Sequence, residues 1–591
     1  MFLHATILTL SLTFLANAAF VASANRPNVV FILTDDQDAQ LGSMDYMPSV
    51  NRHLTQRGVS FQRHYCTVAL CCPSRVTLWT GKAAHNHNVT DVDGPYGGYP
   101  KFISQGLNRN WLPVWLQNAG YNNYYVGKLF NAHTVLNYWA PFPAGFAGTE
   151  FLLDPYQYQY WNPGFQRNFG LPKTYPGQYS TDLVAEKALG FLDDAVKEPK
   201  PFFLTIAPTA PHGNFNVTVD PWTFSYNLTK QNPMPATRHL GLFTDAKVPR
   251  TKNFNPDKPS GVSWVARLPR QDATNVEEND EFYRDRLRAL QAVDEMVDHV
   301  VARLEQYGIL NNTYIFYSSD NGYHIGQHRL QPGKTCGYEE DINVPLIVRG
   351  PGVAEGVKQD FPTSHTDLAP TLLKILGIPL RDDFDGSPIP LVKDVSANAL
   401  ESARREHVQV EFWGLGDPSE NAYSSGSGIN NTYKLLRVMG EGYDLSYSVW
   451  CTNEHELYDM TTDPDQMNNL LAADLTDSTS QPESNTTIIG VTIPTLASRL
   501  DALLLVLKTC KGDTCRNPWK ALQLDGKITS LVDALDPSYD NFFENELPRV
   551  SFSACEAGYI INSEMPLFED LQLSRRRGEM MLNGADLDGR R

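Results

Sequence analysis

The chain has 591 residues, of which 42% are hydrophobic, so it is long enough to bury a sizeable core and to form more than one packed unit. Its 67 acidic residues outnumber its 49 basic residues, giving a formal net charge of −18. This balance argues against nucleic acid as a partner and disfavours a strongly polyanionic one, although a local basic pocket could hold one anion.

The first segment has the features of a signal peptide. An apolar run from Ile7 to Leu15 is followed by small residues that offer cleavage sites near Ala18 or Ala24. The run is too short to span a bilayer, and no later stretch is apolar enough, so we predict a signal peptide over residues 1–24 and no membrane span. The mature protein is then secreted or stays in the secretory pathway, at the cell wall or surface or in a lysosome- or vacuole-like compartment. Secretion permits N-glycans, and acceptor triplets occur at Asn88, Asn216, Asn227, Asn311, Asn430 and Asn485.

Short runs of β-branched and aromatic residues predict the strands of the first part of the chain. They are apolar on both faces, as in buried parallel strands, and cover residues 29–33, 124–126, 202–206, 314–317 and 344–348. Helical patterns lie between them, including residues 182–196 and 283–307. Strands that alternate with helices predict an α/β layered sheet.

The rest of the chain predicts an insertion and a second unit. Residues 213–280 are rich in Asn, Pro and Thr and are interpreted as an insertion near the functional site. Strand-like runs at 407–412 and 432–438 begin a second pattern, and a polar linker follows at 477–487. We therefore expect a catalytic domain over residues 25–400, a smaller C-terminal domain over 401–570, and a mobile basic tail over 571–591.

Oxygen-bearing side chains follow two of the predicted strands. Asp35 and Asp36 come after the first strand, and Asp320 and Asn321 follow the strand at 314–317. Ligands of open α/β sheets bind beyond the carboxyl ends of the strands. A single Asp there usually caps a turn, but two such pairs form an all-oxygen set suited to Ca²⁺ or Mg²⁺.

Three cationic or proton-donating residues lie near other strand ends. They are Lys128, His212 and Lys334. A lone Lys or His in a loop is usually only solvated. Around a divalent cation, however, the three could neutralise a tetrahedral oxyanion and protonate its leaving group.

The cysteines predict one or two disulfides and include a candidate functional residue. Eight cysteines are sparse for this length, so we expect one or two local disulfides, with Cys510 and Cys515 as the best pair. The stretch CCPSR at residues 71–75 is the most informative. Pro73 and Ser74 suit the first turn of a helix, which would place Cys71 at its amino end, where backbone N–H groups favour anions. A buried structural cysteine pair is the alternative.

The stretch CCPSRVTLWTG resembles the signature of the formylglycine-dependent sulfatases, in which the cysteine two places before Pro-Ser-Arg becomes formylglycine (3-oxoalanine). That residue is Cys71 here. The resemblance covers most of the chain, through RPNVVFILTDDQD, YVGKLFN, the pair Pro211-His212, SSDNGYHIGQH, GKTCGYEEDINVPLIVRGPG and ELYDMTTDPDQMNNL. It implies an alkaline-phosphatase-like α/β sandwich, in which helices flank a large mostly parallel mixed sheet, plus a smaller C-terminal domain with an antiparallel sheet.

The resemblance also implies a mechanism and its residues. The aldehyde made from Cys71 by a formylglycine-generating enzyme is hydrated to a gem-diol. One hydroxyl attacks sulfur and the alcohol leaves, after which the second hydroxyl loses a proton and sulfate is expelled. Arg75 would secure the diol and the metal, Lys128 and Lys334 would bind sulfate oxygens, and His212 would be the general acid. By position, one calcium ion would be held by Asp35, Asp36, Asp320 and Asn321, while His85 and His324 are assigned to substrate binding.

One departure from the pattern leaves a role open. Many arylsulfatases have a histidine where this chain has Phe130, and its role could pass to Asn131 or to His324. With Cys71 modified, seven cysteines remain, so at least one is unpaired, and Cys72 is a plausible one.

Four functions remain in play. We expect an arylsulfatase acting on small sulfate esters. The pair Cys71-Cys72, the HNH at 85–87 and the DNGYH segment also resemble N-acetylglucosamine-6-sulfatases, which desulfate sugars. A phosphoesterase of the same fold and a non-catalytic glycan-binding relative are the further alternatives.

Overall fold

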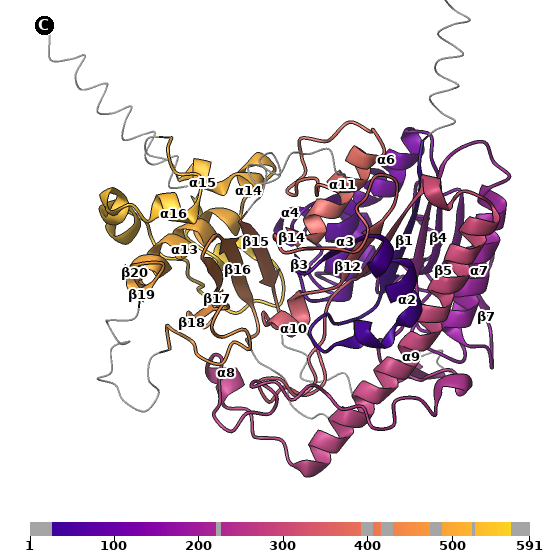
Figure 1. The fold of residues 1–591 in the computed structure, drawn as a ribbon, viewed down its shortest axis with the longest axis horizontal. Coiled ribbons are helices and arrows are strands. Elements are labelled where there is room, and N and C mark those ends of the chain that lie inside the picture. Colours follow the sequence, from indigo (N-terminus) through magenta and orange to yellow (C-terminus); the bar gives the residue numbers. More distant parts are fainter. Residues whose placement is uncertain are drawn as a thin grey trace, which may run out of the picture.

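The computed structural model describes residues 26–219, 226–391, 406–414, 430–472, 487–522 and 526–568. The predicted signal peptide, nearly all of the polar linker, the basic tail and Asn485 lie outside these ranges. Two sheets organise the described residues, one of ten strands and one of four (Figure 1). Every helix within these ranges is too short or too polar to cross a membrane.

The ten-stranded sheet has the order β13-β2-β12-β11-β1-β8-β4-β5-β6-β7. Neighbouring strands from β11 to β5 are parallel, and antiparallel pairs flank them, so the sheet is mixed and mostly parallel as expected. The strands are β1 (Asn28–Thr34), β2 (Val59–Phe61), β4 (Asn122–Lys128), β5 (Gly148–Leu152), β6 (Gly164–Arg167), β7 (Lys173–Thr174), β8 (Phe202–Ala207), β11 (Thr313–Ser319), β12 (Leu346–Arg349) and β13 (Val357–Gln359).

The strand predicted at 344–348 exists as β12, but its predicted parallel direction was wrong. It pairs antiparallel with both β11 and β2. A parallel partner needs a crossover that carries the chain back over a face of the sheet. Residues 320–345, with only the short helix α10 (Glu339–Ile342), instead enter β12 at the edge where β11 ends.

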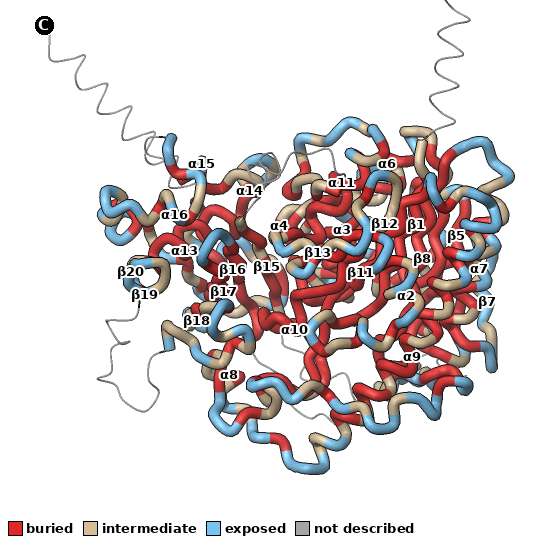
Figure 2. The backbone as a smooth tube through the Cα atoms, in the orientation of Figure 1, coloured by how far each residue is buried: buried red, intermediate tan, exposed pale blue. Residues whose placement is uncertain are grey.

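Helices cover both faces of this sheet. Successive side chains of a strand point to opposite faces, and β1 divides accordingly, with Val29, Phe31 and Leu33 in one core cluster and Val30 and Ile32 in the other. The first cluster contains residues of α3 (Cys71–Thr80), α6 (Leu112–Asn118) and α11 (Leu368–Ile375), and the second those of α2 (Pro48–His53), α7 (Ser180–Ala195) and α9 (Ala273–Gln306). In Figure 2 the buried residues concentrate inside this layered body, and most exposed residues lie at its periphery.

The predicted insertion divides into a hairpin, irregular turns and the start of a helix. Strands β9 (Asn214–Val219) and β10 (Tyr226–Gln231) form a two-stranded sheet of their own. Helix α9 begins at Ala273, ten residues before the predicted start at 283. Its N-cap, Asp272, accepts hydrogen bonds from the backbone N–H groups of Thr274 and Asn275, and this satisfies donors that a helix start leaves unpaired.

The second sheet is antiparallel, as expected, and both of its faces pack against other parts of the chain. It consists of β15 (His407–Phe412), β16 (Tyr433–Gly440), β17 (Tyr443–Trp450) and β18 (His455–Asp459). Helix α13 (Ile493–Leu507) contributes to the core on one face, while residues from 65–84 and 330–344 share the core on the other. The C-terminal sheet is therefore joined to the first part of the chain through buried apolar contacts. The predicted boundary near residue 400 lies outside the described residues.

Two disulfides join parts of the C-terminal region. The expected local bridge Cys510–Cys515 is confirmed, but the second bridge, Cys451–Cys555, is not local, because it spans 104 residues. Sequence spacing does not reveal that the end of β17 lies beside the C-terminal segment. The other four cysteines are buried and unbridged, and Cys72 is one of them.

Candidate active site

Cys71 is the first residue of α3 and lies among charged side chains. Its Sγ is 3.4 Å from Asp35 Oδ1 and 3.1 Å from Lys334 Nζ. Burial raises the pKa of the Cys71 thiol well above its ordinary value. Cys72, by contrast, packs in the apolar core under the sheet. The two neighbouring cysteines thus have different surroundings, and Cys71 alone faces the charged cluster.

The four predicted metal ligands come together because β1 and β11 are paired. Thr34 lies opposite Ser319 in this parallel pair, so Asp35 and Asp320 leave the sheet at the same edge. The backbone N–H of Asp36 donates to Asp320 Oδ1 over 3.0 Å, and Asn321 Nδ2 donates to Asp36 Oδ1 over 2.8 Å.

The oxygen atoms of this group fit a divalent cation. Asp36 Oδ2 and Asn321 Oδ1 are buried and have no hydrogen-bond partner among the described residues. Burial and the nearby charge of Asp320 raise the pKa of Asp35, so its carboxylate gains from a further cation. Buried oxygens without partners are costly, and carboxylate and amide oxygens are the ligands that Ca²⁺ uses.

Three basic residues partly neutralise these carboxylates. Lys128 Nζ is 2.7 Å from Asp35 Oδ2, Lys334 Nζ is 2.6 Å from Asp36 Oδ1, and Arg75 Nε is 2.8 Å from Asp320 Oδ2. Burial alone would raise the pKa of Asp320, but the charges of Arg75, Lys128 and Lys334 together outweigh burial and lower that pKa to about 2. Arg75 also donates to the carbonyl of Lys128 over 2.5 Å, which ties α3 to the end of β4.

His212 directs one ring nitrogen toward the carboxylates. Its Nδ1 is 2.8 Å from the carbonyl of Gly213, an acceptor, so Nδ1 carries the proton there. Its Nε2 is 3.7 Å from Asp36 Oδ2. The ring stacks on Tyr158, with 4.2 Å between centroids, and Tyr158 also lies 4.7 Å from Lys128 Nζ. Tyr158 was not singled out from the sequence, since it follows the end of β5 without any motif.

A cavity of about 360 Å³ opens above Cys71. Its lining combines members of the charged cluster with residues from several other parts of the chain. The lining residues are Leu70, Cys71, Asp91, Val92, Asn131, Tyr158, His212, Phe215, Lys230, Lys334, Thr335, Phe412, Trp413, Gly414 and Ala557. Phe412, at the end of β15 in the C-terminal sheet, therefore completes a cavity that is otherwise lined in part by residues that follow β4, β5 and β8 of the ten-stranded sheet.

The two candidates for the role at the Phe130 position differ in placement. Phe130 is fully buried in the apolar core. Asn131 lines the cavity and donates from Nδ2 to the Tyr158 hydroxyl over 2.7 Å. His324 instead pairs through Nδ1 with Asp341 at 2.8 Å and is not among the cavity-lining residues.

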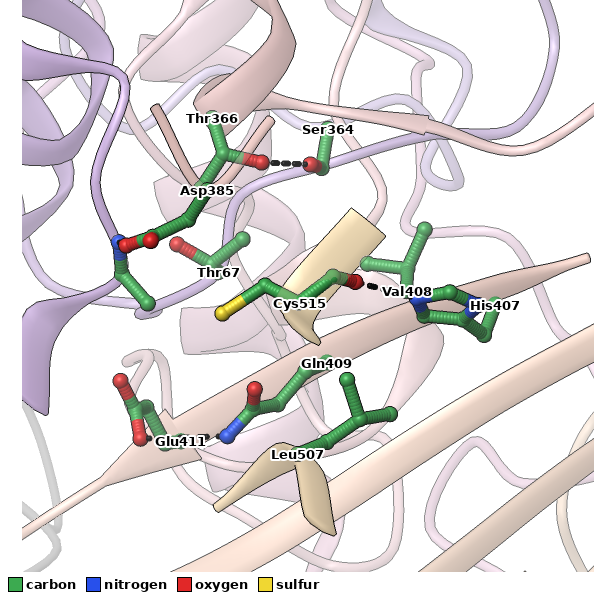
Figure 3. A pocket seen from close by; sticks show the side chains of 11 residues that line it. Thr67, Ser364, Thr366, Asp385, His407, Val408, Gln409, Glu411, Leu507 and Cys515 are labelled. Carbon is green, nitrogen blue, oxygen red and sulfur yellow. Dashed lines mark hydrogen bonds between the residues drawn. The ribbon is translucent and has the colours of Figure 1, made fainter. Parts of the chain in front are cut away.

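His85 lies apart from this cavity. Its Nδ1 is 3.0 Å from Glu411, and its Nε2 is 2.8 Å from the carbonyl of Cys510. Glu411 borders a second, much smaller cavity of about 30 Å³ (Figure 3). There Gln409 Nε2 donates to the Glu411 carboxylate over 3.4 Å, and His407 Nε2 lies 3.0 Å from the Cys515 carbonyl. That space suits roughly one water molecule.

The described glycan acceptors differ in exposure. Asn216, Asn227 and Asn311 are exposed, while Asn88 and Asn430 are half-buried.

Comparisons with known proteins show which family the chain is similar to. The family model described as Sulfatase matches residues 27–378, and a second one, "N-sulphoglucosamine sulphohydrolase, C-terminal", matches residues 326–483. An arylsulfatase of Volvox carteri is 39% identical over 584 residues, covering 95% of this chain and 87% of that protein. The human N-acetylglucosamine-6-sulfatase is 34% identical over 534 residues, covering 84% of this chain and 87% of its own.

A solved structure shares the fold. It was determined in complex with its substrate D-glucosamine-2-N,6-O-disulfate and superposes with a TM-score of 0.60 at 25% identity, covering 75% of this chain and 93% of its own.

Proposed function

The chain belongs to the sulfatase family and is a sulfuric ester hydrolase, and we propose that it is a secreted arylsulfatase that uses formylglycine made from Cys71 and one calcium ion. The observation that carries the proposal is the place of Cys71. It starts α3, lines the cavity and lies 3.1 Å from Lys334 and 3.4 Å from Asp35. Formylglycine, once hydrated, supplies the hydroxyl nucleophile.

The metal would be held by Asp35, Asp36, Asp320 and Asn321, whose oxygens meet at one edge of the sheet. Bound calcium supplies positive charge that polarises a sulfate oxygen. The buried Asp36 Oδ2 and Asn321 Oδ1, which accept no hydrogen bond from the described residues, support this assignment.

The basic side chains would stabilise the negative charge of the sulfate. Lys334 reaches the cavity and Lys128 lies behind it beside Asp35, so together they place two ammonium groups at the nucleophile end. Arg75 holds Asp320 in position and anchors the start of α3 to β4. Charged donors fixed before the reaction stabilise developing charge without having to reorganise.

His212 is proposed as the general acid at the leaving oxygen. The Gly213 carbonyl accepts a hydrogen bond from Nδ1–H, so the second proton of an imidazolium would sit on Nε2, 3.7 Å from Asp36 Oδ2. That Nε2 proton would pass to the departing alcohol oxygen and leave a neutral ring protonated on Nδ1. We assign the role left open at Phe130 to Asn131, because Asn131 lines the cavity and His324 pairs with Asp341 outside it.

The cavity favours a flat, small leaving group. Tyr158 and Phe215 stand beside His212, with ring centroids 4.8 Å apart, and a volume of about 360 Å³ is at the small end for ligand sites. An N-acetylglucosamine-6-sulfatase is the second candidate, supported by the human relative of that name and by the half-exposed Asp91 at the cavity, which could bind sugar hydroxyls.

The first test is the mass of the peptide that contains Cys71, from protein made in a eukaryotic secretory host. We expect a loss of about 18 Da relative to the thiol, the difference between CH₂SH and CHO. Cys71→Ala should abolish aryl sulfate hydrolysis, while Cys72→Ala, a change at the adjacent buried thiol, should retain both aldehyde and turnover. An unmodified thiol in active protein would refute the nucleophile.

Substrate choice needs a second assay. Equal concentrations of an aryl sulfate, N-acetylglucosamine-6-sulfate and an aryl phosphate should give the highest kcat/KM for the aryl sulfate. A higher value for the sugar sulfate would establish the second candidate. Preference for the phosphate would make the protein a phosphoesterase, and turnover of none of them would leave a non-catalytic glycan-binding relative.

A further inference from the structure

The β9–β10 hairpin follows directly after His212 and has one face on the cavity. Phe215 and Lys230 lie opposite each other in the antiparallel register, and both line the cavity. Phe215 is anchored there, because its backbone N–H donates to the Tyr158 carbonyl over 3.2 Å and its ring centroid lies 5.5 Å from that of His212. The inner face of the hairpin is thus a wall of the proposed active site.

The outer face carries the Asn and Thr side chains of two glycan-acceptor triplets, Asn216-Val217-Thr218 and Asn227-Leu228-Thr229. Side chains alternate along a strand, so the neighbours of Phe215 and Lys230 point away from the cavity. Asn216 pairs with Thr229, and Asn227 pairs with Thr218. All four are exposed, and none lines the cavity.

These acceptors lie next to the cavity-lining pair in the hairpin and close to each other. The pair of Asn216 and Thr229 is one residue along the strands from the cavity-lining pair, a step of about 3.4 Å. Asn216 and Asn227 are diagonal neighbours across the two strands, which places them about 7–8 Å apart. Two branched glycans on so small a surface would extend past the edges of the hairpin, because each is bulky relative to a two-stranded sheet.

We propose that Asn216 and Asn227 both carry N-linked glycans, and that these glycans restrict the cavity to small sulfate esters by excluding polymeric ones. The restriction rests on the proposed secretion and sulfatase activity. Phe215 and Lys230 remain uncovered on the inner face, so a small substrate enters unimpeded. A polymeric substrate that enters the cavity past the edge of the β9–β10 hairpin would meet the glycans.

The experiment measures glycan occupancy and size selectivity in the full-length secreted protein. Peptide mass with and without glycosidase gives occupancy at each site. Selectivity is the ratio of kcat/KM for an aryl sulfate linked to dextran to that for the free aryl sulfate. Two variants remove the glycans differently: Asn216→Gln with Asn227→Gln, and Thr218→Ala with Thr229→Ala. Endoglycosidase treatment of the folded wild type removes them without any substitution.

The matched control is Asn311→Gln. Asn311 is also an exposed acceptor, but it precedes β11, whose seven residues separate it from the catalytic edge by roughly 23 Å. We expect both hairpin sites to be occupied and the selectivity ratio to rise about tenfold after glycan removal, equivalent to about 1.4 kcal/mol. Turnover of the free aryl sulfate should stay near the wild-type value after glycan removal. The selectivity ratio of the Asn311→Gln protein should also stay near the wild-type value.

Unoccupied hairpin sites would refute the proposal. A selectivity ratio that does not change on glycan removal would also refute the proposal. The same holds if the dextran-linked substrate is not turned over before or after glycan removal, because the cavity by itself would then exclude that substrate. If free aryl sulfate is not hydrolysed, the proposed function fails instead, and the occupancy result still stands by itself.

Discussion

Glu411 joins two buried cations at the contact between the C-terminal sheet and the first part of the chain. Its carboxylate is 3.0 Å from His85 Nδ1 and 2.9 Å from Lys434 Nζ, and all three residues are buried. Both nitrogens of His85 face oxygen acceptors, Glu411 and the Cys510 carbonyl, so the ring is a doubly protonated imidazolium. Glu564 lies 3.2 Å from Lys434 and contributes the second negative charge.

Glu411→Gln should therefore be strongly destabilising. The change keeps the shape of the side chain but leaves His85 and Lys434 with only the negative charge of Glu564 between them. Removing one partner of a buried ion pair costs about 3–5 kcal/mol of unfolding free energy. The free energy of unfolding, from denaturant titration, is the measurement. Adding Lys434→Met removes one unmatched cation, so the double variant should be more stable than the sum of the two single changes by about 0.5–3 kcal/mol.

The matched control is Glu295→Gln. Glu295 also contacts one arginine and one histidine, Arg238 at 2.6 Å and His239 at 2.9 Å, but its side chain is 42% exposed. Exposed pairs contribute about 0–1 kcal/mol. If Glu411→Gln costs no more than Glu295→Gln, or if its cost simply adds to that of Lys434→Met, the three buried charges do not act as a unit.

The pH dependence of this cluster has a definite sign. Burial alone would raise the pKa of Glu411, but His85 and Lys434 outweigh it and lower the pKa, so its stabilisation is present above the unfolded value of about 4.3 and is lost in more acidic solution. Burial alone would lower the pKa of His85, but Glu411 raises it, so this contribution is full below about 6.5 and is lost as pH rises through the folded pKa. The energetic difference between wild type and Glu411→Gln should be largest between these values.

Three further predictions follow from other parts of the structure. Chelation of divalent cations should lower the melting temperature, and calcium at about one hundred times its Kd should restore about 2.7 kcal/mol of unfolding free energy. A melting curve that does not change on chelation would contradict the proposed metal site. Burial raises the pKa of Glu340 to about 7, and its Oε2 has no hydrogen-bond partner among the described residues. The wild type should lose up to about 3 kcal/mol as pH rises from about 4.3 to 7, because the folded state holds the proton more tightly, whereas Glu340→Gln should show no such loss. Replacing Cys451 and Cys555 by Ala should cost about 2–5 kcal/mol, more than replacing Cys510 and Cys515, because a crosslink over 104 residues restricts the unfolded chain more than one over 5; equal costs would contradict this.

Much of the site could be predicted from the sequence because it depends on local features. Buried strands have continuous apolar runs, and polar residues directly after parallel strands must meet at one edge of the sheet. For that reason Asp35, Asp36, Asp320 and Asn321 were expected together and lie together. The helix start at Cys71 was expected from Pro73 and Ser74, and α3 begins there.

Other features were decided by the tertiary structure alone. The sequence assigns His85 to substrate binding, yet its side chain pairs with Glu411 on β15, 326 residues away, and is not among the residues that line the cavity. The direction of β12, the Cys451–Cys555 bridge and the cavity walls from Phe412 and Ala557 likewise have no local signature. Each depends on which distant segments come into contact when the two sheets pack, and the free energy of that packing is shared over the whole core, so no short stretch of residues encodes it.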